Sequence, residues 1–375
     1  RSAEAFHEET VRKLSKLHLY DCLRASCLEM ALHGEDVPKS VYENLIEAVD
    51  GALPLMHRYI ALRKKVLCLK EQHMYDIYMP LVENADIGVS YEEAYDIVVE
   101  GLAPLGKDYQ ALLRRAKDER WIDVCETEGK KSGAYSTGSY DTHPYVLLNY
   151  QRTTNEIFTI AHEMGHSIHT YKSSAAQPYP KADYTIFLAE IASTVNEVLL
   201  LKHLLKSARE KGDKKTEKFL LNYYMDMIRT TLFRQSQFAE FEQIVHKMAE
   251  DGEPLTDENL CATYYALNKK YYGDAIIHDK EISYEWARIP HFYRSFYVYK
   301  YATGIISAIS IAHRVLTEGE SAVKDYFSFL SGGCCTDPVS ILKRAGVDLT
   351  AKAPFETAMK EFEETLEAFE KIDER

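Results

Sequence analysis

The sequence predicts a mainly α-helical protein that contains one small β-sheet. Its 375 residues include only 17 glycines and 11 prolines, and both shares fall below the usual values of about 7% and 5%. Few residues therefore interrupt regular structure. Apolar residues recur with helical spacing over long stretches of the chain. With 46% hydrophobic residues, the chain can bury a large core.

Predicted helices occupy most of the first third of the chain. They cover residues 2–32, a run that starts near residue 38, and residues 108–121. Between residues 122 and 150, glycines alternate with short apolar runs, which predicts the small β-sheet. Helices resume after residue 153. Three pairs of polar residues match the capping-box pattern of helix starts: Ser90 with Glu93, Thr153 with Glu156, and Thr256 with Asn259.

The net charge of the chain limits which partners it can bind, and its cysteines indicate the cellular compartment. The net charge of -13 and the pI of about 5.6 would repel nucleic acid and anionic membrane surfaces, so neither is predicted as a partner. No run of about 18 apolar residues is present, as a membrane span would require. The seven cysteines are scattered and odd in number, which predicts a reducing compartment, the cytoplasm. The adjacent Cys334 and Cys335 are interpreted as incidental thiols.

Residues 162–166 read His-Glu-Met-Gly-His, the HExxH pattern. On a helix the two histidines lie about 40° apart on one face, so both imidazoles can reach one metal ion. Chance alone produces the pattern in about 5% of such chains, but a predicted helix start precedes it and an apolar stripe lies opposite. The motif therefore indicates His162 and His166 as zinc ligands and Glu163 as the general base of a metallopeptidase. The apolar stripe consists of Ile157, Ile160, Ala161, Met164 and Ile168.

A catalytic zinc ion normally takes a third protein ligand, and Glu190 is the best candidate. The metzincin pattern requires a histidine six residues after the second histidine, where this chain has Lys172. His169 lies too close along the same helix. Glu190 lies on the polar face of a second predicted helix, and Glu197, on the same face, is predicted to orient a ligand. Should Glu190 not bind the metal, Glu197 or Asp183 becomes the better third ligand. The opposite, apolar face of this helix carries Leu188, Ile191, Val195 and Leu199.

These residues predict peptide hydrolysis with one zinc ion per chain. Zinc lowers the pKa of a bound water to about 7. Glu163 is expected to accept a proton from that water as it attacks the peptide carbonyl, and then to pass the proton to the leaving amine. The predicted strand near residues 132–137 could pair with an extended peptide through backbone hydrogen bonds, which would make the specificity broad.

The sequence resembles the thimet oligopeptidase family of zinc metallopeptidases, and most closely its bacterial branch, oligoendopeptidase F. The similarity implies a helical zincin-type catalytic domain around a deep channel, with endopeptidase activity on short peptides. It implies that residues 1–121 form part of the channel wall and that residues 122–375 form the zinc-binding catalytic region. It also implies that the chain is the C-terminal part of a longer protein. The similarity rests on residues 129–136, 162–169, 190–197 and 290–301.

The resemblance further implies a transition-state role for a segment rich in histidine and tyrosine. The tetrahedral oxyanion needs hydrogen-bond donors besides the metal. Hydroxyl and imidazole N–H groups of this kind occur at His291, Tyr297, Tyr299 and Tyr301.

Two other functions are consistent with the sequence. A zinc carboxypeptidase would share the water-activating residues and would need a cation for the terminal carboxylate of its substrate, for which Arg288 and Arg294 are candidates. A helical peptide-binding or structural module with an accidental HExxH pattern would instead purify without stoichiometric zinc.

Overall fold

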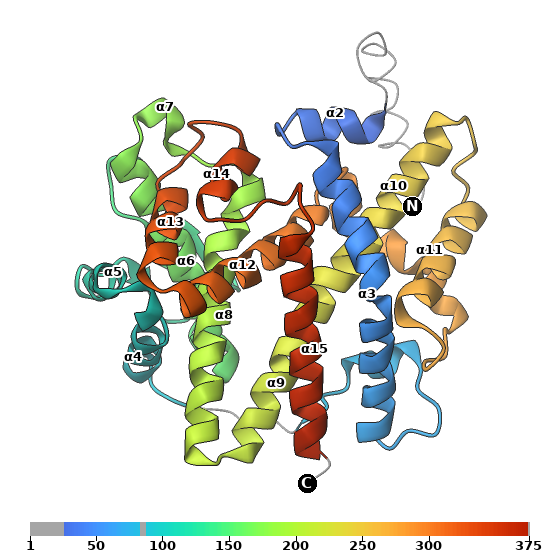
Figure 1. Cartoon of the computed structure of the whole chain (residues 1–375), viewed down its shortest axis with the longest axis horizontal. Helices are drawn as coiled ribbons and strands as arrows, with labels where there is room; N and C mark the ends of the chain where they lie inside the picture. The colour runs from blue at the N-terminus through green and yellow to red at the C-terminus, as the bar shows by residue number, and fades with distance from the viewer. Residues whose placement is uncertain (1–25, 83–87, 374–375) are drawn as a thin grey trace. The chain divides into compact units, whose positions relative to one another are not determined.

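The computed structural model of the protein describes residues 26–82 and 88–373. Helices dominate these residues (Figure 1). The three strands form one small sheet directly before the helix that carries the HExxH motif, which confirms the predicted fold class. Of the predicted helix over 2–32, residues 2–25 lie outside the described residues, and the remainder is helical from Cys27. None of the described helices is long and apolar enough to cross a membrane.

The chain divides into two compact units, and the predicted boundary at residue 121 lies inside the second of them. Of the described residues, unit 1 comprises 26–81, 225–303 and 350–373, and unit 2 comprises 82, 88–224 and 304–349. Helices α9 (Lys214–Ile228) and α12 (Tyr299–Glu318) contain residues of both units. The roles predicted for regions 1–121 and 122–375 stay predictions.

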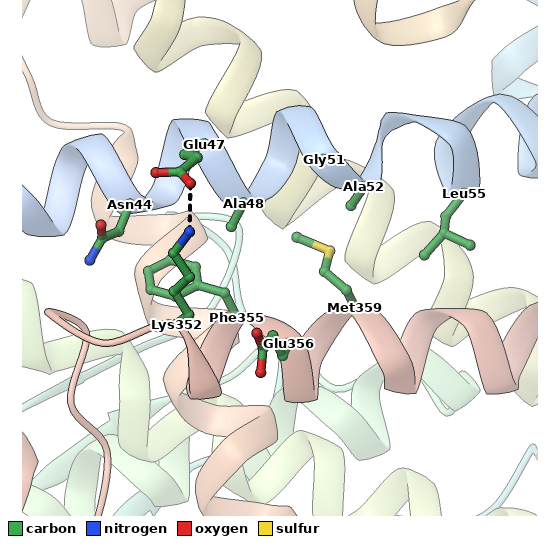
Figure 2. Close-up of a pocket in the computed structure, with 10 residues that line it drawn as sticks. All are labelled: Asn44, Glu47, Ala48, Gly51, Ala52, Leu55, Lys352, Phe355, Glu356 and Met359. Carbon is green, nitrogen blue, oxygen red and sulfur yellow. Dashed lines mark hydrogen bonds and ion pairs between the residues drawn. The ribbon is translucent and has the colours of Figure 1, made fainter.

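Unit 1 is built on two long helices that run side by side, α3 and α15 (Figure 1). Arg58 of α3 donates to Glu370 of α15. Toward the other end of α3, a groove of about 290 Å³ opens between the two helices, and an ion pair of 2.6 Å between Glu47 and Lys352 lies at its side (Figure 2). The elements of unit 1 are α2 (Cys27–His33), α3 (Lys39–Val66), η1 (Met74–Tyr78), the π-helical turn η3 (Arg229–Phe233), α10 (Arg234–Glu250), α11 (Asp257–Tyr272), η4 (Lys280–Arg288), η5 (Pro290–Tyr293) and α15 (Ala353–Asp373).

Unit 2 contains the sheet, with strand order β1-β3-β2. Strand β1 pairs with β3 in parallel, with Ile122 opposite Val146, and β2 pairs with β3 in antiparallel, with Ser136 opposite Val146. The predicted sheet between residues 122 and 150 is therefore present. The elements of unit 2 are α4 (Tyr91–Gly101), η2 (Ala103–Leu105), α5 (Lys107–Asp118), β1 (Ile122–Asp123), β2 (Tyr135–Thr137), β3 (Tyr145–Leu147), α6 (Thr154–Ala176), α7 (Tyr179–Ala182), α8 (Ile186–Lys211), α13 (Glu320–Leu330) and α14 (Pro338–Arg344).

The predicted helix starts are present, although one cap differs from the prediction. Ser90 and Glu93 form the complete capping box of α4. At α11, the Thr256 hydroxyl accepts the N–H of Asn259. The capping box predicted for α6 is wrong in both halves. The Thr153 side chain makes no cap bond, and the Glu156 carboxylate accepts the backbone N–H of Gln151 rather than that of Thr153. The helix nevertheless begins one residue after the predicted cap.

Candidate metal centre

Helices α6 and α8 of unit 2 bring three potential metal ligands together. His162 and His166 are one turn apart on α6, and their Nε2 atoms are 3.1 Å from each other. Glu190 projects from α8, and its Oε2 atom lies 3.5 Å from His162 Nε2 and 3.6 Å from His166 Nε2. All three side chains are partly buried. The structure thus places together the three residues that the sequence predicts as metal ligands.

The spacing of these three atoms fits a tetrahedral ion. Zinc binds imidazole nitrogen and carboxylate oxygen at about 2.0–2.2 Å, and tetrahedral geometry then spaces neighbouring ligand atoms about 3.4 Å apart. The three observed separations, 3.1, 3.5 and 3.6 Å, bracket this value. Two imidazoles and one carboxylate are also a common ligand set of catalytic zinc. The donor set and its geometry therefore fit a zinc ion with one position left for water.

The charge distribution of the metal-free site also favours a cation. His162 donates from Nδ1 to Glu197 Oε1 over 2.5 Å. Burial lowers the pKa of His162, but its bonds to Glu190 and Glu197 outweigh burial and raise the pKa to about 10. Burial and the neighbouring charge of His162 lower the pKa of His166 to about 4. The additional proton of His162 thus lies between the carboxylates of Glu190 and Glu197. A bound metal cation would replace it.

Glu163 follows the first histidine of the motif and is available as a base. Its side chain is buried, with 6% of its surface exposed, and its Oε2 atom has no hydrogen-bond partner among the described residues. Burial, the largest effect, and the carboxylates of Glu190 and Glu197 together raise the pKa of Glu163 to about 7 against the opposing effect of His162. A carboxylate with a raised pKa is suited to accept and return a proton near neutral pH.

The alternative ligands weighed from the sequence lie outside this group. Asp183 is exposed on the connection before α8. His169 is completely buried, and its ring stacks on Tyr184 with centroids 3.6 Å apart. Lys172 extends its ammonium group over the ring of Phe327. Among the described residues, only His162, His166 and Glu190 form a group of three that could hold a metal ion.

The predicted transition-state residues lie in unit 1, and the structure brings three of the four together. The Tyr301 hydroxyl is 3.5 Å from His291 Nε2, and Tyr297 packs against both rings. Tyr299 is set apart, because side chains two positions apart on a helix point about 160° away from each other. Its buried ring contacts Tyr42. The transition-state role of this segment stays a prediction.

Two residues that hold the site together were missed by the sequence interpretation. An added Cβ on Gly165 would lie 2.5 Å from Ser193 Cα, so the backbones of α6 and α8 meet there. Asn196 of α8 is fully buried, donates to the carbonyl of Ala161 on α6 and accepts from the Tyr109 hydroxyl of α5, each over 2.9 Å. A glycine inside a helical pattern commonly has a packing reason, so Gly165 carried a signal.

Substituting Gly165 by alanine is expected to destabilise the protein and weaken metal binding together. The new methyl group would meet backbone atoms, which cannot rotate away, so α8 must move. Overpacking of this kind costs about 1–3 kcal/mol, and the shift carries Glu190 with it. Thermal unfolding and zinc competition measure the two effects. Gly51→Ala is the matched control, since this helix glycine has open space at its Cβ position and should lose neither property. Wild-type stability and affinity in Gly165→Ala would contradict the prediction.

Comparison with known proteins agrees with this site. The model of peptidase family M3 matches residues 7–361. The chain is 49% identical over 347 residues to oligopeptidase PepF of Bacillus subtilis, covering 92% of this chain and 51% of that protein. It is 46% identical over 372 residues to the chromosomal oligoendopeptidase F of Lactococcus lactis subsp. cremoris, covering 98% and 61%.

A solved structure supports the same relationship. The crystal structure of oligoendopeptidase-F from Enterococcus faecium is 35% identical, with a TM-score of 0.76 over 100% of this chain and 62% of that chain. The chain spans about half to three fifths of the length of the curated relatives that it matches. The resemblance predicted from the sequence is confirmed, and the chain belongs to peptidase family M3.

Proposed function

We propose that this chain is a zinc-dependent endopeptidase that hydrolyses internal bonds of short peptides. The observation that carries the proposal is the triangle of His162, His166 and Glu190, with Glu163 next to it on α6. Peptidase family M3 implies a metal, and its relatives in Bacillus subtilis and Lactococcus lactis are named as an oligopeptidase and an oligoendopeptidase. Because those relatives are longer than this chain, their activity is proposed for it.

Each residue of the site has a separate proposed role in hydrolysis. His162, His166 and Glu190 would hold one zinc ion. When bound, zinc lowers the pKa of a coordinated water to about 7 and polarises a carbonyl group. Glu163 would accept a proton from the water during its attack on the peptide carbonyl and would deliver that proton to the leaving amine. Glu197 accepts the Nδ1–H of His162, so it would keep the Nε2 atom of that ring directed at the metal position.

The candidate residues for a carboxypeptidase are already occupied by other contacts. Arg288 forms an ion pair with Glu285, and Arg294 lies over the ring of Tyr297 at 4.6 Å from its centroid. A carboxypeptidase would use such a cation to bind the terminal carboxylate of its substrate. The contacts of Arg288 and Arg294 therefore do not favour carboxypeptidase activity over endopeptidase activity.

We also propose that the protein resides in the cytoplasm. The six cysteines among the described residues, at positions 27, 68, 125, 261, 334 and 335, are all free thiols. Free thiols persist in a reducing compartment, where glutathione and thioredoxin keep them reduced.

Zinc content and hydrolysis, measured on one preparation, test the proposed function. We expect about one zinc per chain and internal cleavage of a quenched fluorescent peptide that is acetylated at its N-terminus and amidated at its C-terminus. A chelator should abolish cleavage, and added zinc should restore it. A zinc-free protein would indicate a helical module, whereas loss of cleavage on blocking the C-terminus would indicate a carboxypeptidase.

A further inference from the structure

A cavity of about 350 Å³ lies in unit 2 beside the first two turns of α6. Its walls are residues 132–134, just before β2, residues 148–151, just after β3, and Glu156 and Thr159 of α6. Glu156, Thr159 and Glu163 follow one another at three and four positions, so they share one face of the helix. With a rise of 1.5 Å per residue, Thr159 and Glu156 lie about 6 and 10 Å before Glu163 along the axis. The part of α6 that lines the cavity therefore ends about one helical turn before the proposed base.

The cavity is lined by two carboxylates and by one lysine whose ammonium group is bonded elsewhere. Glu126 and Glu156 both line it, and Gln151 bonds to each of them, through its side-chain amide and its backbone N–H respectively. Neither carboxylate forms an ion pair within residues 26–82 and 88–373. The side chain of Lys130, which also lines the cavity, is only 5% exposed. Its ammonium group donates to the Cys125 carbonyl over 2.7 Å and pairs with Asp123 over 3.3 Å.

Glu126 and Glu156 outnumber the single lysine of the lining, so the lining side chains carry a net negative charge. A partly enclosed site lined by charges of one sign attracts ligands of the opposite sign, because its walls exclude much of the screening water. The neutral lining atoms include the Thr159 hydroxyl and the Asn149 amide, which tolerate a polar ligand but add no charge. The electrostatics of the cavity therefore favour a cationic group.

We propose that this cavity is a substrate subsite that binds a positively charged group of the peptide. This inference rests on the proposed peptidase function. An extended peptide advances about 3.3–3.6 Å per residue, so the 6–10 Å along α6 places the bound group about two or three residues from the scissile bond. Either a lysine or arginine side chain or the free α-ammonium group of a short peptide supplies the required cation, and Glu126 and Glu156 receive it.

Matched peptides distinguish the two sources of the cation. One set of peptide pairs differs by lysine or norleucine at a single position, and the position is varied over the three residues on each side of the cleaved bond. A second set of pairs differs by a free or an acetylated N-terminus. Binding is measured by fluorescence anisotropy in the zinc-loaded Glu163→Gln background, and cleavage is measured in the wild-type background. Glu126→Gln and Glu156→Gln are tested in both backgrounds. Glu128→Gln is the matched control, because Glu128 is exposed in the same loop and does not line the cavity.

Each cavity variant is expected to reduce the preference for the cationic over the neutral peptide by about tenfold, the worth of one charged hydrogen bond. Glu128→Gln should keep the wild-type preference. If the cavity variants no longer distinguish a free from an acetylated N-terminus, the α-ammonium group is the bound cation. If they no longer distinguish lysine from norleucine, the side chain is the bound cation. Glu126 is exposed, so its variant tests the subsite even if Glu156→Gln perturbs α6.

Two outcomes count against the subsite in different ways. Unchanged preferences in both cavity variants of an active enzyme, or an equal loss in Glu128→Gln, would overturn the subsite alone. A zinc-loaded wild-type protein that neither binds nor cleaves any of the peptides would overturn the proposed function, and the subsite with it.

Discussion

His162→Ala and His166→Ala are each expected to abolish zinc retention and peptide hydrolysis together. Either substitution leaves two of the three proposed ligands, and two ligands hold a zinc ion far less tightly than three. The measurements are zinc stoichiometry after dialysis and cleavage of the quenched peptide. The loss of hydrolysis should exceed that of any variant that keeps the metal, because the activated water disappears with it.

The control for these variants is His313→Ala, which removes an exposed histidine of α12 outside the ligand group. It should retain zinc and activity. Circular dichroism establishes that each variant is folded. Full zinc occupancy in either motif variant would contradict the ligand assignment.

Glu190→Gln extends the test to the third ligand. Undiminished zinc binding in that variant would transfer the third-ligand role to Glu197, whose carboxylate already contacts His162.

The local part of this site was predictable from the sequence, because helix geometry alone fixes it. Residues four apart on a helix share a face, so the positions of His162 and His166 followed from their spacing once the helix was recognised. The same reasoning placed Glu190 and Glu197 on one face of α8. In the structure both carboxylates contact His162. The mainly helical fold with a small sheet also followed from patterns within single segments.

The remainder depends on contacts between segments that are distant in sequence. The contact between Gly165 and Ser193 sets the distance between α6 and α8. The sequence pattern of either helix alone does not predict that distance. Glu156 matched a capping box locally, yet it accepts a bond from Gln151 and lines a cavity that also involves Glu126. Tyr299 matched its neighbours in type, but its position within α12 directs it into the core.

Glu163→Gln should separate catalysis from metal binding. The substitution removes the proposed base and keeps all three proposed ligands, so zinc should remain at about one per chain. Turnover should fall by about 10²–10⁴, the usual contribution of a general acid–base group. Folding should be nearly unaffected, because glutamine has almost the shape of glutamate and the Oε2 atom that it replaces makes no hydrogen bond among the described residues.

The two possible failures of this prediction have different meanings. Near wild-type turnover would show that Glu163 is not the base, whereas loss of zinc would show that its carboxylate supports the ligands structurally. Glu210→Gln on the exposed surface of α8 controls for the loss of one negative charge and should change neither property. Residual hydrolysis must also vanish with chelator, because activity that survives metal removal belongs to a contaminating protease. Retained zinc with lost, chelator-sensitive turnover would therefore assign the proton transfer to Glu163.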